Sequence, residues 1–203
     1  MMNIHEAIRT RRSVGKVKQD SIPQDHIEQI LEAGTWAPNH KHTEPWRFFV
    51  MRDGGRERLG NALADIALSK EGEKSAEETA EIRQSAINKA MRAPVVIGVA
   101  VVPSDDPKII ELEEYGAVFA AIQNMLLQAH ALELGAVWRT GDPCFHSLMN
   151  QAFGLRDKDK MLGFIYLGVP DMDAKPGKRQ DVASKTVWLN DAADRLDGTN
   201  PSQ

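Results

Sequence analysis

Cysteine is nearly absent from this chain, in which Cys144 is the one thiol. A single cysteine excludes an intramolecular disulfide framework, the usual support of small secreted proteins. The first residues, MMNIHEAIRTRRS, also lack an apolar stretch long enough for a secretory signal. Both absences lead us to expect a reducing, cytoplasmic location.

The sequence also lacks the short motifs of several enzyme classes. It contains neither G-x-G-x-x-G nor G-x-x-x-x-G-K-[ST], which excludes the standard dinucleotide and nucleotide cradles. The G-x-S-x-G elbow of serine hydrolases is missing too. Cys144 stands near His146, but a lone cysteine is more often a small buried side chain than a nucleophile. His40 and His42 have no nearby partner at zinc-like spacing, so we expect no metal site.

No basic stripe runs through the chain. Its formal net charge is −4 at pH 7, which argues against a general nucleic-acid binder because no row of cations replaces phosphate counterions. With 203 residues and 42% hydrophobic side chains, it has the composition of one globular domain. We expect that domain over residues 1–170. A polar extension over residues 171–203 carries one apolar patch, at 187–189, which we expect to pack on a partner subunit.

One long apolar stretch, residues 115–134, dominates the second half of the chain. No Asp, Glu, Lys or Arg occurs between Glu114 and Glu133, and one α-helix over this stretch would be roughly 30 Å long. It holds too many amides for a membrane span, so we expect a buried core helix. Ala117, Ala120 and Ala121 form a flat face that predicts contact with a second subunit. Gly135 is expected to end the helix.

Other apolar runs predict the rest of the fold. Four strands are expected, at residues 47–52, 95–102, 136–138 and 161–167. The run VVIGVAVV has no polar face, which indicates the buried middle of a sheet. Further helices are expected near residues 4–8, 23–34, 56–69 and 142–153. Residues 71–83 are crowded with charge, which favours a solvated surface helix over the alternative of a mobile lid.

Two segments carry candidate binding residues. Arg11, Arg12 and Ser13 form a good monophosphate clamp, because guanidinium forks match phosphate oxygens. Residues 36–46, WAPNHKHTEPW, form a loop dense in aromatic and imidazole side chains. Together with Arg139 and Thr140 after the long helix, these residues suit a planar, anionic ligand better than side-chain catalysis.

Four motifs in register resemble the FMN-dependent nitroreductase family. They are Arg11-Arg12-Ser13, Ala37-Pro38-Asn39-His40-Lys41 with Pro45-Trp46, the Ala-rich helix with its Gln and Asn, and Gly135-Ala136-Val137-Trp138-Arg139. The match runs from about residue 4 to residue 168 and is nearest to a small, compact branch. It implies an α+β fold: a three-layer α/β/α sandwich with a mainly antiparallel mixed sheet and a long buried dimer-interface helix.

The resemblance also implies which residues bind FMN. Arg11, Arg12 and Ser13 would hold its phosphate and ribityl side, and Arg179 corresponds to a C-terminal basic residue on the same phosphate. No side chain is expected to be catalytic, since the chemistry takes place at N5 of the flavin.

The flavin ring would have its own set of contacts. Trp36 and His40 would touch it, while Trp138, Arg139 and Thr140 would close the site from the other subunit.

The chain departs from the family pattern at two places. Many relatives carry a Lys or Arg two positions after the Ser, where this chain has Gly15. We hypothesise that Lys41 or Arg139 replaces that cation. The loop over residues 37–45 also lacks the Asn and Gln of the commoner family sequence.

The implied activity is an FMN-dependent NAD(P)H oxidoreductase. Electrons would pass from NADH or NADPH through FMN to a nitroaromatic, a quinone or a related acceptor by a ping-pong mechanism, in a homodimer with FMN at the subunit interface. Two alternatives stay open: a flavin reservoir or sensor without turnover, and a helical dimerisation module without cofactor.

Overall fold

A single four-stranded sheet lies at the centre of the computed structural model, which describes residues 2–70 and 72–190. Its strands are β1 (Trp46–Arg52), β2 (Val95–Val101), β3 (Gly135–Arg139) and β4 (Lys160–Gly168). They lie in the order β1-β2-β4-β3, and each neighbouring pair is antiparallel. A parallel bridge joins Ser13 to Ala136, beyond the named strands.

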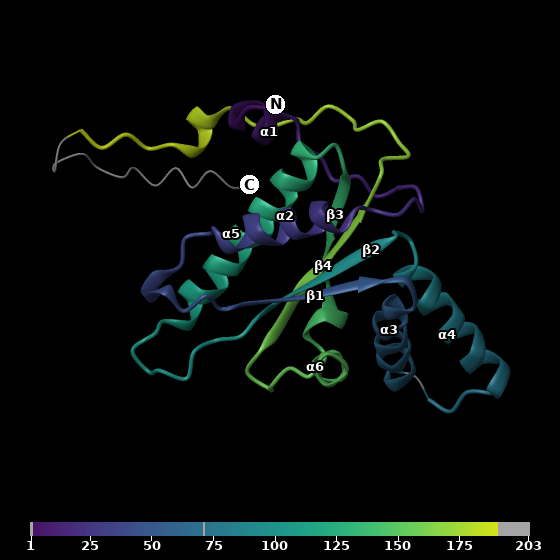
Figure 1. Cartoon of the computed structure of the whole chain (residues 1–203). Coiled ribbons are helices and arrows are strands. Elements are labelled where there is room, and N and C mark those ends of the chain that lie inside the picture. The colour runs from purple at the N-terminus through teal and green to yellow at the C-terminus, as the bar shows by residue number, and fades with distance from the viewer. Residues whose placement is uncertain (1, 71, 191–203) are drawn as a thin grey trace.

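β2 is the buried middle of the sheet, as its apolar run predicts, because all seven of its residues are buried. Helices cover both faces (Figure 1). The core on one face packs under α2 (Gln24–Thr35) and α5 (Glu111–Ala131). The core on the other face packs under α3 (Glu57–Ser69), α4 (Ala76–Ala90) and α6 (Ser147–Phe153). The expected α+β, three-layer architecture is confirmed.

The long helix α5 is confirmed, but its ends differ from the prediction. It begins one turn earlier, where Glu111, Glu113 and Glu114 form an acidic first turn that suits the positive end of the helix dipole. Its stop is Glu133, at φ 60°, where the amides of Glu133 and Leu134 donate to the carbonyls of His130 and Ala129 in a Schellman pattern.

The residue type of Gly135 predicts a helix end. In the structure the helix ends earlier, and Gly135 is instead the first residue of β3. A Cβ at this position would lie 2.9 Å from the side chain of Val14. The segment after α1 (Ile4–Thr10) needs that space, because the amide of Val14 donates to the carbonyl of Ala136 at 2.9 Å. The glycine thus serves packing between distant parts of the chain.

Two of the three alanines predicted to form the docking face of α5 are already covered within one chain. Ala117 and Ala121 are 4% and 0% exposed, and Ala120 is half-buried. The face that stays open carries Leu112 and Phe119, which are 78% and 43% exposed. The open side is therefore larger and more apolar than the alanine face suggests.

Two smaller expectations also change. The charged segment after α3 forms an ordered helix, α4, which starts at a capping box between Ser75 and Glu78 and runs to Ala90. The helix expected over residues 142–153 is divided into a 3-10 turn, Asp142–Phe145, and α6, because His146 adopts an extended conformation and caps α6.

The C-terminal extension returns past α1 (Figure 1). Arg12 holds it there, since its Nε donates to the carbonyl of Lys175 at 3.2 Å. Further along, Val187, Trp188 and Leu189 are 69%, 79% and 60% exposed. The rest of the extension, residues 191–203, lies outside the described residues.

Candidate cofactor site

The Arg11–Ser13 segment lies along the outer edge of β3. Ser13 forms the bridge to Ala136, and Val17 forms another to Pro170. β3 is an edge strand whose backbone groups need partners, so this short pairing both covers the edge and fixes the segment. The residues predicted to hold a phosphate therefore stand on a rigid element.

Three arginines gather at this edge. Partial burial, followed by the charges of Arg12 and Arg179, lowers the pKa of the Arg11 guanidinium. Arg12 is anchored by its Nη1, which donates to the carbonyls of Arg9 at 2.8 Å and Arg11 at 2.7 Å. The structure thus brings Arg179 to the two adjacent arginines from the other end of the chain. Such a cluster repels itself until an anion binds.

His130 belongs to the same cluster and was not predicted. Its Nε2 lies 2.8 Å from Thr10 Oγ1, at the C-terminal end of α5. Partial burial and the charges of Arg11 and Arg12 lower its pKa. The sequence feature that could have pointed to His130 is its position as a polar residue near the end of an apolar helix.

Arg139 reaches the space that Gly15 leaves open. A Cβ at residue 15 would lie 3.8 Å from Nη2 of Arg139. The guanidinium carbon lies 5.3 Å from the centre of the Tyr166 ring, in cation–π range. Its Nε is buried and has no hydrogen-bond partner among the described residues. A buried donor without an acceptor is costly, so this group is suited to a bound ligand.

A small cavity of about 160 Å³ opens beside Arg139. Its lining includes two further cations, Lys89 and Arg92, together with Thr140, Cys144 and Tyr166. Burial raises the pKa of Cys144 to about 11, so its thiol stays protonated at neutral pH and is not a nucleophile. The cavity therefore combines cations and hydrogen-bonding groups with an apolar lining from Leu59, Leu63 and Phe164.

Trp138 lies on the opposite face of the sheet from Arg139. Successive residues of a strand alternate between faces, and Trp138 packs against Phe119 of α5 with ring centres 5.9 Å apart. Its indole nitrogen donates to the carbonyl of Leu162 at 3.1 Å. Trp138 therefore borders the open face of α5, while Arg139 and Thr140 line the cavity.

His40 lies at the other end of α5, where its Nδ1 contacts Glu113 Oε2 at 2.6 Å in the first turn of the helix. Trp36 is 79% exposed and follows the end of α2, which contacts the middle of α5 through Ala33 and Asn124. At 1.5 Å per residue, Glu113 and His130 are about 25 Å apart along the helix. One chain therefore does not bring His40 to Arg11, Arg12 and Ser13. It does bring Arg139 next to Gly15, while the expectation that residues 138–140 close the site of the other subunit stays a prediction.

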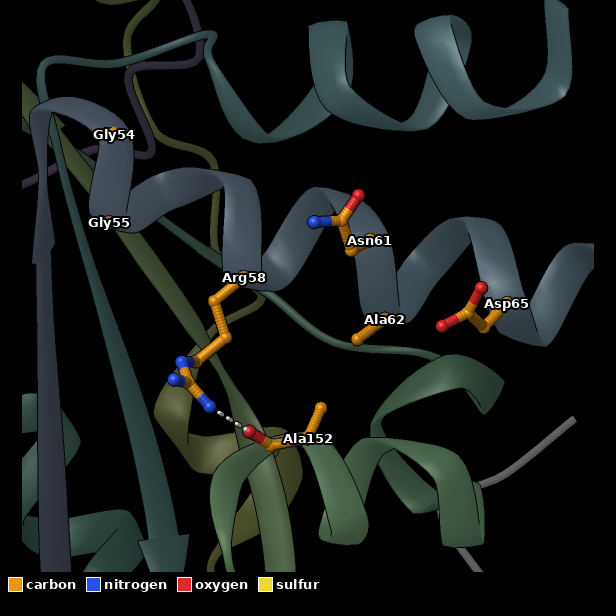
Figure 2. Close-up of a pocket in the computed structure, with 7 residues that line it drawn as sticks. All are labelled: Gly54, Gly55, Arg58, Asn61, Ala62, Asp65 and Ala152. Carbon is orange, nitrogen blue, oxygen red and sulfur yellow. Dashed lines mark hydrogen bonds between the residues drawn. The ribbon is translucent and has the colours of Figure 1, made fainter. Parts of the chain in front are cut away.

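A larger groove lies elsewhere and includes none of the predicted cofactor residues. It has a volume of about 460 Å³ and lies between α3 and α6 (Figure 2). Its one arginine, Arg58, already donates to the carbonyl of Ala152 at 2.7 Å, as Figure 2 shows. The cation in this groove is satisfied within the chain.

Residues 2–70 and 72–190 contain no group of three or more His, Cys, Asp or Glu side chains arranged to hold a metal ion. Within the same ranges, no helix has the length and apolar character needed to cross a membrane.

The chain is similar to known proteins over most of its length. The profile of the nitroreductase family matches residues 8–169. YdjA of Escherichia coli K12, a candidate NAD(P)H nitroreductase, is 32% identical over 85% of this chain and 91% of its own length. YfhC of Bacillus subtilis 168, also a candidate NAD(P)H nitroreductase, is 33% identical over 90% of this chain and 92% of its own length.

Solved structures show the same fold. A nitroreductase-like protein from Bacillus cereus superposes with a TM-score of 0.80 at 28% identity, covering 94% of this chain and 98% of its own. A candidate nitroreductase from Desulfovibrio desulfuricans, solved in complex with FMN, gives a TM-score of 0.69 at 28% identity over 93% and 98% of the two chains. With most of its length matched in sequence and in fold, the chain belongs to the nitroreductase family.

Proposed function

We propose that the protein is an FMN-dependent NAD(P)H oxidoreductase that reduces a nitroaromatic, a quinone or a related acceptor. One observation carries the proposal. A line of cations along the edge of β3 runs from Arg11, Arg12 and Arg179 to Arg139, whose buried Nε has no partner among the described residues. A phosphate at one end of this line would neutralise the three arginines, and a polar ring at the other end would give Arg139 Nε a hydrogen-bond acceptor.

The residues present fit FMN. A dianionic phosphate would relieve the repulsion among Arg11, Arg12 and Arg179 through charge-assisted hydrogen bonds. Ser13 lies next to this cluster and offers a hydroxyl. Arg139 would gain an acceptor for its buried Nε. An FMN complex in the Desulfovibrio relative is in keeping with this assignment.

The chemistry comes from the cofactor, and the chain supplies position and charge. FMN, when bound, would supply hydride transfer at N5. Arg139, held against the Tyr166 ring, would offer a fixed positive charge to the reduced, anionic form. Cys144 stays protonated and takes no part. Arg139 in the space at Gly15 thus supports the hypothesis that it replaces the missing cation, with Lys41 as the alternative.

We further propose that two copies share each site. His40, at the first turn of α5, is about 25 Å along the helix from His130 and the arginine cluster, a distance that one chain does not close. A two-fold axis through the open faces of α5, at Leu112 and Phe119, would place one helix end against the other. Val187, Trp188 and Leu189 of the extension are then available to pack on the second copy.

The first test is whether the purified protein holds flavin and turns over. We expect the visible absorption of oxidised flavin, its bleaching by NADH or NADPH, and its return on adding a quinone. Flavin that no nicotinamide reduces would instead favour a reservoir or sensor. A colourless protein that does not quench added FMN would favour a dimerisation module.

The second test is the kinetic order. Because the donor would leave before the acceptor is reduced, varying NADPH at several fixed quinone concentrations should give parallel double-reciprocal lines. Intersecting lines would indicate a ternary complex and contradict the ping-pong order.

A further inference from the structure

A second hollow lies next to the cofactor cavity. It is a groove of about 690 Å³ between α3 and α4. Leu63, Lys89 and Pro143 line both this groove and the 160 Å³ cavity beside Arg139, so the two are continuous. The proposed cofactor contacts leave the groove unused.

The groove has an apolar floor between charged sides. Leu63 and Ile66 of α3 face Ile82 of α4 across it. Lys89 stands where the groove meets the cavity, and Arg92 is on the cavity side of that junction. Such a surface suits a flat apolar body with an acidic group at one end.

The cations at the junction are unpaired, whereas Arg83 of α4 is paired. Within residues 2–70 and 72–190, neither Lys89 nor Arg92 forms a salt bridge or a side-chain hydrogen bond. Arg83, which lines neither hollow, is paired with Asp65 of α3 at 2.9 Å. The positive charge of Lys89 and Arg92 is therefore uncompensated at the junction, while Lys70 and Glu81 also line the groove.

We propose that this groove binds the electron acceptor, and that the acceptor is an aromatic ring carrying a carboxylate or sulfonate. The ring lies on Leu63, Ile66 and Ile82, and the acid group meets Lys89 and Arg92. The proposal rests on the proposed oxidoreductase function. For a quinone the balance is NAD(P)H + H⁺ + quinone → NAD(P)⁺ + hydroquinone, so two electrons and two protons reach the acceptor.

The test compares two acceptors, a neutral naphthoquinone and the same ring carrying a sulfonate. The ratio of their kcat/KM values, at saturating donor, cancels effects on flavin reduction. We expect the wild-type protein to favour the sulfonated ring. Lys89→Gln should lower the ratio about ten-fold and Lys89→Glu further, because the charge at the junction is removed and then reversed.

Arg83→Gln is the matched control, with the same loss of charge on the same helix. It should leave the ratio unchanged. An unchanged ratio in Lys89→Gln, or an equal fall in Arg83→Gln, would overturn the groove assignment.

A binding measurement separates this proposal from the proposed function. Naphthalene-2-sulfonate accepts no electrons here, and its affinity is measured by calorimetry on the protein as purified. We expect about ten-fold weaker binding in Lys89→Gln and no change in Arg83→Gln. A protein without NAD(P)H oxidation that still shows this pattern would contradict the proposed function alone. If the protein oxidises NAD(P)H but Lys89→Gln does not weaken sulfonate binding, the groove assignment alone is contradicted.

Discussion

The two ends of α5 differ in how complete they are within one chain. At the C-terminal end, the charges of Arg12 and Arg179 act on Arg11, those of Arg11 and Arg12 act on His130, and backbone carbonyls hold Arg12. At the N-terminal end, His40 contacts Glu113, and Trp36, on the same loop, is 79% exposed. One end carries a cluster of cations, and the other lies beside a loop with an exposed aromatic ring. This contrast is the basis of our proposal that two copies share each site.

The open face of α5 gives the largest expected effect. Phe119→Glu should shift the protein toward monomer and release FMN in the same step, because cofactor and dimer are linked by mass action. Ala121→Glu should instead reduce folding itself by several kcal/mol, because Ala121 is 0% exposed within one chain and a carboxylate there has no partner. Sedimentation and circular dichroism separate the two outcomes. A yellow, FMN-saturated Phe119→Glu monomer would contradict the shared site.

The arginine cluster gives the next largest effect. Arg12→Glu should weaken FMN binding strongly, since each charge-assisted bond to phosphate contributes about 1.5–3 kcal/mol. It should also free the C-terminal extension, because Arg12 holds the carbonyl of Lys175. FMN fluorescence titration measures the first effect, and limited proteolysis of the extension measures the second. Riboflavin, which lacks the phosphate, is the control ligand, and its binding should change less.

His130 gives the smallest effect, and its sign is fixed. Its pKa is lower in the folded protein than the ordinary value of about 6.5, so the unfolded chain takes up its proton first as pH falls. Stability should therefore be lost as the pH drops through the interval between the two values, and His130→Gln should remove that part of the loss. Bound phosphate should raise this pKa, as NMR titration with and without FMN would show. If the pKa of His130 is the same with and without FMN, His130 does not belong to the phosphate-binding cluster.

Much of the fold could be predicted because its signals are local. The run VVIGVAVV has no polar side and can only be a strand covered on both faces, and the acidic residues before the long apolar stretch suit a helix start. The use of Gly135 is not local. Whether a glycine ends a helix or makes room for Val14 depends on a segment 121 residues away in the chain (135 − 14), which residue type alone does not reveal.

The candidate site was predicted as a set of residues but not as an arrangement. Arg11, Arg12 and Arg179 come together as the charges suggest. The separation of His40 from these arginines depends on how the loop after α2 packs against α5. Trp138 and Arg139 lie on opposite faces of the sheet because successive strand residues alternate between faces. Lys89 and Arg92 were missed because isolated surface residues carry no motif, and Tyr166 because it lies in an apolar strand that is buried in the core.

Mixing two damaged proteins tests the shared site most directly. Arg12→Glu damages the phosphate end, and the double variant Trp36→Ala with His40→Ala damages the aromatic end, so neither should bind FMN tightly alone. In a mixed dimer one site carries both defects and the other carries none. After co-refolding equal amounts, FMN fluorescence titration should recover tight binding at about a quarter of all sites, the statistical share for random two-fold pairing. No recovery at any mixing ratio would place the whole site within one chain and contradict the account.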